Sequence, residues 1–249
     1  MIDRSHLVVV PDADALAERV ARHTLDTARE AIARHGRFDV ALAGGSTPKA
    51  AYALLAAAPL RDEIDWTRAR FFFGDERCVP PDDDESNYKM ARLALLEPLG
   101  VADDAVFRMH GEDEPRAAAA AYAGVLRATL DRDDAGIPVF DLVMLGMGPD
   151  GHTASLFPGT DPLDDDAALV KAPFVVKFGT HRLTLTPATI NAAREGAIAT
   201  AGATKTDALA AVMNGAYEPA TYPVQIVRPR DGRLWWLVDE IAAKNVRPA

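Results

Sequence analysis

A histidine that directly follows a glycine-rich turn is the strongest candidate for catalysis in this sequence. His152 follows the glycine-rich segment Gly146-Met147-Gly148-Pro149-Asp150-Gly151. Glycines let the backbone turn sharply and leave space for a ligand. An imidazole with the unperturbed pKa of about 6.5 can act as a base at neutral pH. Asp150 can fix the tautomer of this imidazole or stabilise its protonated form. A local role in the turn is the alternative, and the glycines and Asp150 favour catalysis.

A second motif is suited to bind an anion. The residues Gly44-Gly45-Ser46-Thr47-Pro48 come directly after a predicted strand and directly before a predicted helix. We expect Ser46 or Thr47 to cap this helix and Pro48 to lie in its first turn. Free N–H groups and the positive end of the helix dipole then face one point, where a phosphate can bind. A plain strand-to-helix turn is the alternative, and the spacing differs from that of a nucleotide-binding P-loop.

A third cluster contains charged residues at the end of another predicted strand. In Gly74-Asp75-Glu76-Arg77-Cys78, the carboxylates can orient a polar substrate, and the guanidinium can hold a phosphate through two hydrogen bonds. A structural group of ion pairs is the alternative. Cys78 has no neighbouring histidine in the sequence, so we do not expect it to be a nucleophile.

Three cations in the last third can add to an anion site. Lys177, Arg182 and Lys205 lie near predicted ends of strands or helices. Each alone is usually a surface charge, but two or three of them near the loop of Gly44, Gly45, Ser46 and Thr47 would form a sugar-phosphate pocket.

The remaining histidines are weaker candidates. We expect four of them to be solvated: His6, His23, His35 and His110. His181 lies beside Arg182 and can contact a ligand, although a surface position is the simpler interpretation. The spacing of His, Asp and Glu does not indicate a metal site, and the acidic run Asp82–Glu85 is expected to be a solvated loop.

The elements that position these residues alternate between strands and helices. Short apolar runs predict strands at Leu7–Val10, Phe38–Ala43, Ala69–Phe73, Phe140–Leu145, Leu183–Leu185, Gly196–Ala201, Val224–Val227 and Leu234–Val238. Helices are predicted at Asp12–His35, Ala50–Ala58, Asn87–Leu96, Arg116–Leu130 and Lys205–Met213, with one more after Pro187. This alternation predicts an α/β fold with a mostly parallel, doubly wound sheet and helices on both faces, and it leaves room for a small subdomain. We expect one domain over residues 1–249, with Asp161–Asp166 in a surface loop.

Composition limits the classes of partner. The chain has 249 residues with 27 Lys and Arg against 37 Asp and Glu, a net charge of −10. This balance argues against binding to nucleic acid or to an anionic membrane surface. The single cysteine excludes an internal disulfide framework and a site with several thiolate ligands. No run reaches the 18 or so apolar residues of a membrane span, and the N-terminus lacks a cleavage pattern. We expect a cytoplasmic location.

With these motifs, the chain resembles the 6-phosphogluconolactonases over nearly its whole length. The most discriminating segment is Thr153-Ala154-Ser155-Leu156-Phe157-Pro158-Gly159; in the related glucosamine-6-phosphate deaminases, the sequence typically continues with Ile-Ala-Phe-Asn-Glu-Pro. The resemblance also includes Ala43–Pro48, Gly74–Arg77, Glu85–Tyr88, Gly146–His152, Arg182–Thr186, Gly202 with Lys205, and the final strand with Trp236 and Asp239. Two positions differ from the family pattern. Cys78 replaces a tryptophan, and Val175-Val176-Lys177-Phe178-Gly179 replaces Ser-Pro-Lys-Pro-Pro.

The resemblance implies hydrolysis of 6-phospho-D-glucono-1,5-lactone to 6-phosphogluconate, in the oxidative pentose phosphate pathway. It implies that His152 is the general base and that Asp150 orients it. The phosphate is expected on the amides of Gly45, Ser46 and Thr47, with Arg77 and Lys177 as side-chain partners. Arg77 can alternatively stabilise the oxyanion. Further substrate-binding residues are expected at Gly44, Asp75, Arg182 and Lys205.

The same resemblance leaves other functions open. No metal, nucleotide or thiol cofactor is expected, and the expected partner is a small sugar-phosphate lactone. The alternatives are an isomerase or deaminase that uses Asp75 or Glu76 as its base, and a noncatalytic sugar-phosphate sensor. A monomer and a small homo-oligomer are both compatible with the sequence.

Overall fold

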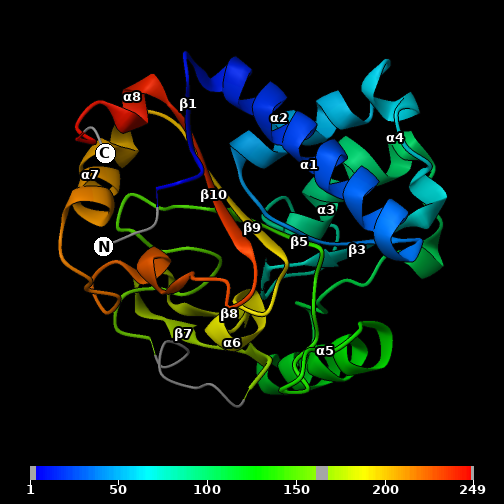
Figure 1. The fold of residues 1–249 in the computed structure, drawn as a ribbon. Helices are drawn as coiled ribbons and strands as arrows, with labels where there is room; N and C mark the ends of the chain where they lie inside the picture. The colour runs from blue at the N-terminus through cyan, green and yellow to red at the C-terminus, as the bar shows by residue number, and fades with distance from the viewer. Residues whose placement is uncertain (1–3, 161–167, 248–249) are drawn as a thin grey trace.

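The computed structural model describes residues 4–160 and 168–247 and contains a six-stranded parallel sheet (Figure 1). Across the sheet, the strands are β1 (Leu7–Val10), β10 (Arg233–Asp239), β9 (Glu195–Thr200), β5 (Leu142–Gly146), β2 (Phe38–Leu42) and β3 (Ala69–Phe73). All neighbouring pairs run parallel. The chain passes from β2 outward to β3, and later from β5 outward through β9 and β10. The order therefore reverses between β2 and β5, where ligands bind in open α/β sheets.

Helices cover both faces of this sheet. They are α1 (Ala13–His35), α2 (Ser46–Leu55), α3 (Asn87–Ala91), α4 (Glu97–Leu99), α5 (Pro115–Thr129), α6 (Pro187–Ile190), α7 (Thr206–Asn214) and α8 (Glu240–Ala243). Figure 1 shows α1 and α2 on one side of the sheet and α7 and α8 on the other. The predicted α/β class, the mostly parallel sheet and the helices on both faces are confirmed.

Local sequence explains the longest helix. Asp12 accepts a hydrogen bond from the N–H of Ala15 and caps the start of α1, and Gly36 ends it in the left-handed conformation. Leu16 and Leu25 from this helix are fully buried against the sheet. Every residue of β2 is also buried, as expected for a strand covered on both faces.

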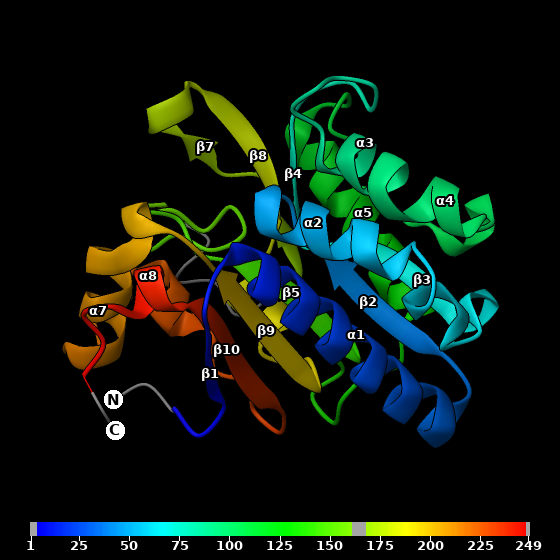
Figure 2. The same ribbon diagram turned by 90° about the horizontal axis from the view of Figure 1, so that it is seen from above.

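A second, smaller sheet lies beside the carboxyl ends of the parallel strands. It contains β4 (Asp75–Arg77), β8 (Thr180–Leu185) and β6 (Val170–Lys171) in antiparallel pairing, and β7 (Phe174–Val175) also pairs with β8. Figure 2 shows β4, β7 and β8 on the side where β2 and β3 end. Because β4 begins two residues after β3 ends, the third motif of the sequence is itself a strand.

Several predicted elements differ from the structure. Val224–Val227 is not a strand, because Pro223–Ile226 form a 3₁₀ helix that places Val224 and Val227 in the core. Helix α2 begins at Ser46, four residues before the predicted start. The predicted helix at 87–96 changes from α to π geometry at Arg92. The loop at Asp82–Glu85 is confirmed, and Asp161–Asp166 lies outside the described residues. Within residues 4–160 and 168–247, no helix has the length and apolarity to cross a bilayer.

Two buried tyrosines hold the ends of β2 and β3. The Tyr52 hydroxyl accepts from the Ala43 N–H and donates to the Ala43 carbonyl, both at 3.0 Å. The Tyr122 hydroxyl accepts from the Phe73 N–H at 2.8 Å and lies 3.3 Å from the Phe73 carbonyl oxygen. Burial raises the pKa of both phenols, so the hydroxyls stay protonated. Each tyrosine fixes the backbone from which a predicted functional loop begins.

Candidate active site

A cavity of about 280 Å³ lies at the carboxyl ends of the parallel strands and brings the predicted motifs together. Its walls include Gly44, Gly45, Ser46, Thr47, Asp75, Arg77, Gly146, Gly148, His152, Arg182 and Lys205. The loops after β2 and β5 contribute on either side of the point where the strand order reverses. The three sequence motifs therefore form parts of the wall of one cavity.

The start of α2 presents backbone N–H groups to this cavity. Gly45 occupies the cap position with φ +104°, a conformation that side-chain-bearing residues rarely adopt. The expectation that Ser46 or Thr47 caps the helix is wrong, because both lie inside its first turn and no side chain caps it. The leading amides thus keep their hydrogen-bonding capacity, which is the arrangement that binds anions.

His152 and Asp150 form a hydrogen-bonded pair. Nδ1 of His152 contacts Oδ1 of Asp150, and Oδ2 of Asp150 lies 3.1 Å from Nζ of Lys177. Burial alone would raise the pKa of Asp150, but the hydrogen bonds and charge of His152 and the hydrogen bond from Lys177 lower it to about 2. Asp150 is therefore ionised at neutral pH and able to fix the imidazole through Nδ1.

A glycine is required beside this pair. A Cβ atom at Gly148 would lie 2.0 Å from Nδ1 and Cε1 of His152, and 2.7 Å from Oδ1 of Asp150.

Ala154, two residues after His152, has φ +46° and is the one non-glycine residue in the described chain with positive φ. Such backbone costs about 1–3 kcal/mol and is concentrated at functional sites.

Asp75 belongs to a polar group on the cavity wall. Its Oδ2 accepts from the Ser155 hydroxyl at 2.7 Å, and its Oδ1 accepts from the Asn87 amide at 3.1 Å. Both partners also line the cavity. Asp75 can therefore contact a polar ligand, although each of its oxygens already has one hydrogen bond.

Glu76 has a different environment from its neighbour. Its side chain is only 2% exposed, and its carboxylate accepts hydrogen bonds from the N–H groups of Arg77, Asn87 and Tyr88 and from the Ser86 hydroxyl. Burial raises the pKa of Glu76, although these hydrogen bonds oppose the rise. Glu76 joins β4 to the start of α3, and it does not line the cavity. This arrangement argues against Glu76 as a catalytic base.

Three of the predicted cations line the cavity. Arg77 and Arg182 are paired in register between β4 and β8, and Lys205 precedes α7. Burial lowers the pKa of Arg182, and the charge of Arg77 lowers it further. Burial also lowers the pKa of Lys205. Nε of Arg182 is buried without a hydrogen-bond partner in the described structure. This surplus of positive charge fits an anionic ligand.

Lys177 lies beside the cavity, close enough that its charge helps to lower the pKa of Lys205. The Lys177 ammonium pairs with Asp150, and Lys177 is not among the described residues that line the cavity.

Cys78 is half-buried, and burial raises the pKa of its thiol. The raised pKa agrees with the expectation that Cys78 is not a nucleophile.

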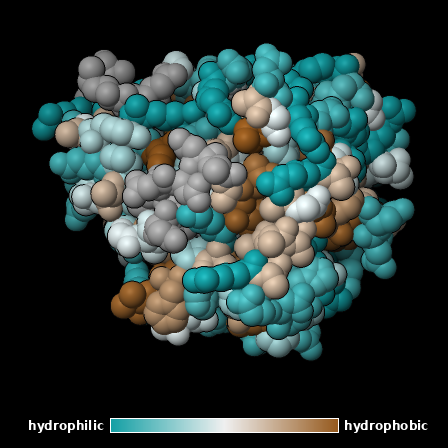
Figure 3. All heavy atoms as spheres, turned by 90° about the horizontal axis from the view of Figure 1, so that it is seen from below, coloured by the Kyte–Doolittle hydropathy of each residue, from teal (hydrophilic) through white to brown (hydrophobic). Residues whose placement is uncertain are grey.

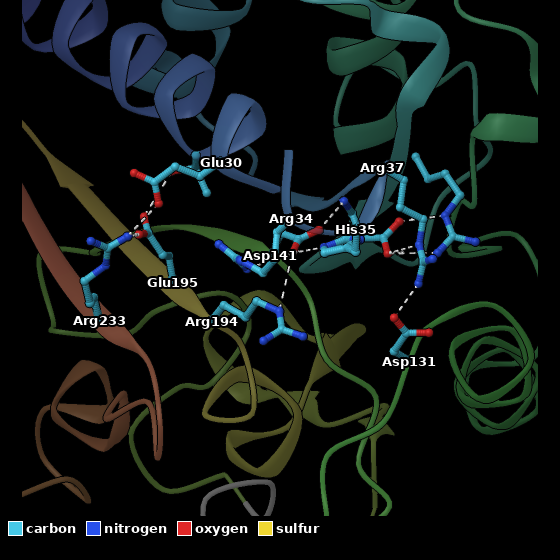
Figure 4. Close-up of polar contacts among 12 residues, drawn as sticks. Glu30, Arg34, His35, Arg37, Asp131, Asp141, Arg194, Glu195 and Arg233 are labelled. Carbon is cyan, nitrogen blue, oxygen red and sulfur yellow. Dashed lines mark hydrogen bonds and ion pairs between the residues drawn. The ribbon is translucent and has the colours of Figure 1, made fainter. Parts of the chain in front are cut away.

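The other histidines partly contradict the sequence prediction. His23 is 5% exposed, lies 3.3 Å from Glu195 and contacts the Trp235 ring, so its expected solvation is wrong. His35 is also not freely solvated, because Nε2 lies 2.8 Å from Oδ1 of the buried Asp141 (Figure 4). His6 stacks on Trp235. Solvation is confirmed for His110, which is exposed near two acidic residues.

His181 does not line this cavity. It contacts the carbonyl of Ala172 at 2.9 Å and faces a separate surface cavity. The cavity at the strand ends also contains residues that the sequence does not single out as candidates, namely Asn87, Ser155, Phe157, Phe178 and Thr200. Asn87 and Ser155 lie in motifs that were recognised, whereas Phe178 lies where the chain departs from the family pattern.

Comparison with known proteins gives consistent matches. A family model described as glucosamine-6-phosphate isomerases/6-phosphogluconolactonase matches residues 11–236. The chain is 46% identical over 173 residues to a 6-phosphogluconolactonase of Treponema pallidum, covering 70% of this chain and 71% of the relative. It is 40% identical over 221 residues to a 6-phosphogluconolactonase of Synechocystis, covering 88% and 89%. The structure of a 6-phosphogluconolactonase from Trypanosoma brucei matches with a TM-score of 0.87 and 32% identity, covering 97% and 98%.

Proposed function

The chain belongs to the family of glucosamine-6-phosphate isomerases and 6-phosphogluconolactonases, and on this premise we propose that it hydrolyses 6-phospho-D-glucono-1,5-lactone to 6-phospho-D-gluconate. The enzyme is then a carboxylic ester hydrolase of the oxidative pentose phosphate pathway. The observation that supports this function best is one cavity that combines an uncapped helix start with a His–Asp pair. The first can bind the phosphate, and the second can activate water.

The phosphate binds at the start of α2. The N–H groups of Gly45, Ser46 and Thr47 donate to its oxygens, and the helix dipole adds a favourable field. Arg77, Arg182 and Lys205 supply positive charge for the phosphate and for the oxyanion that develops on the lactone. This binding holds the lactone carbonyl where water can attack it.

His152 acts as the general base. Its Nε2 accepts a proton from water while the water oxygen bonds to C1 of the lactone, giving a tetrahedral oxyanion. The oxyanion then collapses, the bond from C1 to the ring oxygen breaks, and the imidazolium returns its proton to that oxygen. Asp150 holds the tautomer with Nε2 unprotonated and stabilises the imidazolium. Each step uses water and side chains, so the scheme needs no metal, nucleotide or thiol.

An isomerase or deaminase is the alternative within the family. Such an enzyme needs a base at C2 of the sugar, and Asp75 is the cavity carboxylate available for this role. Both oxygens of Asp75 already accept hydrogen bonds, whereas His152 has a carboxylate partner and a place on the cavity wall. We therefore favour the lactonase reaction.

The test is the initial rate of hydrolysis of freshly generated lactone, corrected for its spontaneous opening. His152→Gln should lower kcat by about 10²–10⁴-fold, the usual contribution of general base catalysis. His110→Gln, at an exposed position, is the matched control and should keep full activity. Near-complete activity in His152→Gln contradicts the mechanism. A wild-type rate equal to the background, with ammonia release from glucosamine 6-phosphate, would instead support the deaminase.

A further inference from the structure

An aromatic ring lies on the face of the proposed base. The Phe157 ring stacks on the His152 imidazole with a centroid distance of 4.1 Å and an interplanar angle of 27°. Phe157 is only 7% exposed, so its position is determined by its surroundings. Gly148 lies against the Nδ1–Cε1 edge of the same imidazole, and Asp150 holds Nδ1. The imidazole of His152 is therefore contacted along one edge, at Nδ1 and on one ring face.

Phe157 is itself supported from a separate part of the chain. The Phe178 ring meets it edge-on, with a centroid distance of 5.7 Å and an interplanar angle of 77°. Phe178 belongs to the turn between β7 and β8, and the Arg182 guanidinium lies 5.0 Å from its ring. This turn forms an apolar corner of the surface (Figure 3), where Phe178 is 47% exposed and Val176 is 85% exposed.

The hydrogen bond to Asp150 leaves one freedom of the imidazole unconstrained. A bond at Nδ1 fixes that atom but permits the ring to tilt about the bond, which moves Nε2 away from the attacking water. A flat partner on the ring face opposes this tilt, and stacked aromatic pairs have a geometric preference that aliphatic side chains lack. Catalytic groups are sensitive to such displacement, since a 1 Å error can reduce a rate by about 10²-fold.

We propose that Phe157 is a positioning residue for His152, and that Phe178 holds Phe157 in place from the β7–β8 turn. This inference rests on the proposed function, because it gives Phe157 an effect only through a catalytic His152. Phe157 does not transfer a proton or bind the phosphate. Its removal should therefore lower kcat and leave KM nearly unchanged.

The test compares two substitutions at one position. Phe157→Leu keeps an apolar side chain but removes the flat ring, and it should lower kcat about 10-fold with KM within about twofold. Phe157→Tyr keeps the ring and should retain most of kcat. A double-mutant cycle with His152→Gln separates positioning from general packing. In that background, Phe157→Leu should cause no further loss.

Each outcome has a defined meaning. Wild-type kcat in Phe157→Leu, an effect on KM alone, equal losses for Leu and Tyr, or a full additional loss in the double mutant would overturn the inference. If His152→Gln is fully active, the proposed function fails first, and the two failures are thus distinguishable. If Phe157→Leu does not fold, Phe178→Ala is the second variant, because that side chain is half exposed. It should lower kcat about threefold, and an unchanged kcat overturns the inference.

Discussion

Opposite edges of the parallel sheet both carry dense groups of charged residues, but the charges are balanced at one edge only. At the amino ends of the strands, buried carboxylates lie among several arginines and His35 (Figure 4). At the carboxyl ends, arginine and lysine side chains line a cavity. The two edges belong to the same strands. They differ in whether the charged side chains have partners of opposite charge, and this difference distinguishes a structural cluster from a binding site.

The buried carboxylates of the amino edge all have partners, although Nε2 of His23 and Nδ1 of His35 are buried without a hydrogen bond. Asp39 accepts from Nε of Arg70 at 2.6 Å and from Nε of Arg37 at 3.1 Å. Asp141 contacts His35 at 2.8 Å and accepts from the backbone N–H of Asp39 at 2.9 Å. Glu195 pairs with Arg233, and its pKa is lowered because hydrogen bonds and nearby cations outweigh the effect of burial. Each buried carboxylate is compensated, so the removal of one member of a pair would leave the other without its partner and destabilise the fold.

The carboxyl edge has unused capacity. Arg182 is half-buried with an unpartnered Nε, and Arg77 is its neighbour across β4 and β8. The start of α2 has no side-chain cap. Such features lower the stability of the protein without a ligand, and an anion that binds there raises the stability again. An incomplete charge balance is therefore the better indicator of function than charge density.

The largest expected effect on stability lies at the amino edge. Asp141→Ala leaves the Asp39 N–H and several cations without their acceptor, and should lower the free energy of unfolding by about 3 kcal/mol or more. Urea denaturation measures this loss, and kcat of the folded fraction should stay within about twofold. Asp131→Ala removes an exposed partner of Arg37 and should cost about 0–1 kcal/mol. Equal, small losses in both variants would mean that this edge is not a stabilising network.

The second prediction reverses this pattern at the carboxyl edge. Arg182→Met removes a half-buried cation that has a like-charged neighbour and an unpartnered Nε, so the free energy of unfolding should stay equal or rise. Binding of 6-phosphogluconate should weaken by about 1.5–3 kcal/mol, or about 10–150-fold in Kd, as for the loss of a charged hydrogen bond. Calorimetric titration and urea denaturation together test this prediction. Arg68→Met, at an exposed position, is the control. A destabilised variant with unchanged Kd would contradict the comparison.

A smaller effect should appear as a pH dependence of binding. Burial lowers the pKa of Lys205, so its ammonium loses its proton at lower pH than an ordinary lysine, whose pKa is about 10.4. As the pH rises, the anion site loses one positive charge, and Kd for 6-phosphogluconate should increase several-fold. Lys205→Arg keeps its charge and should show a flatter curve. Identical curves for the two proteins would exclude Lys205 as an anion-binding cation.

The sequence predicts the carboxyl edge better than the amino edge for a physical reason. Glycine turns at Gly44, Gly45 and Gly148, and the alternation of strands and helices, are local signals. They are sufficient to predict where the strands end and which residues follow. The compensated network of Asp39, Asp141 and Glu195 depends on partners far apart in the chain, so His23 and His35 were wrongly expected to be solvated.

Tertiary placement also decides the details of the site. Glu76 and Asp75 are adjacent and chemically alike, yet one joins two elements and the other lines the cavity. Strand alternation sends them to opposite faces of β4, but three residues give too short a pattern to predict a strand. The stacking of Phe157 on His152 likewise depends on the path of the loop after β5.

Lys177 gives the smallest and most selective test. The sequence resemblance assigns it to the phosphate, whereas its ammonium lies 3.1 Å from Oδ2 of Asp150. Because Lys177 is about half exposed, the pair should be worth about 0.2–1 kcal/mol. Lys177→Met should therefore lower kcat about 1.5–5-fold through Asp150, with unchanged KM and less effect at high salt.

If Lys177 binds the phosphate, Lys177→Met should have the opposite effect on the two kinetic constants. KM should rise, 6-phosphogluconate should bind more weakly, and kcat should stay intact. Lys177→Arg should retain activity in either case, and Lys244→Met, on the exposed surface after α8, controls for the loss of one charge. If KM rises tenfold while kcat is kept, Lys177 belongs with Arg182 and Lys205 among the anion-binding cations. If kcat alone falls, the cations of this edge divide into those that bind the substrate and one that supports the His152–Asp150 pair.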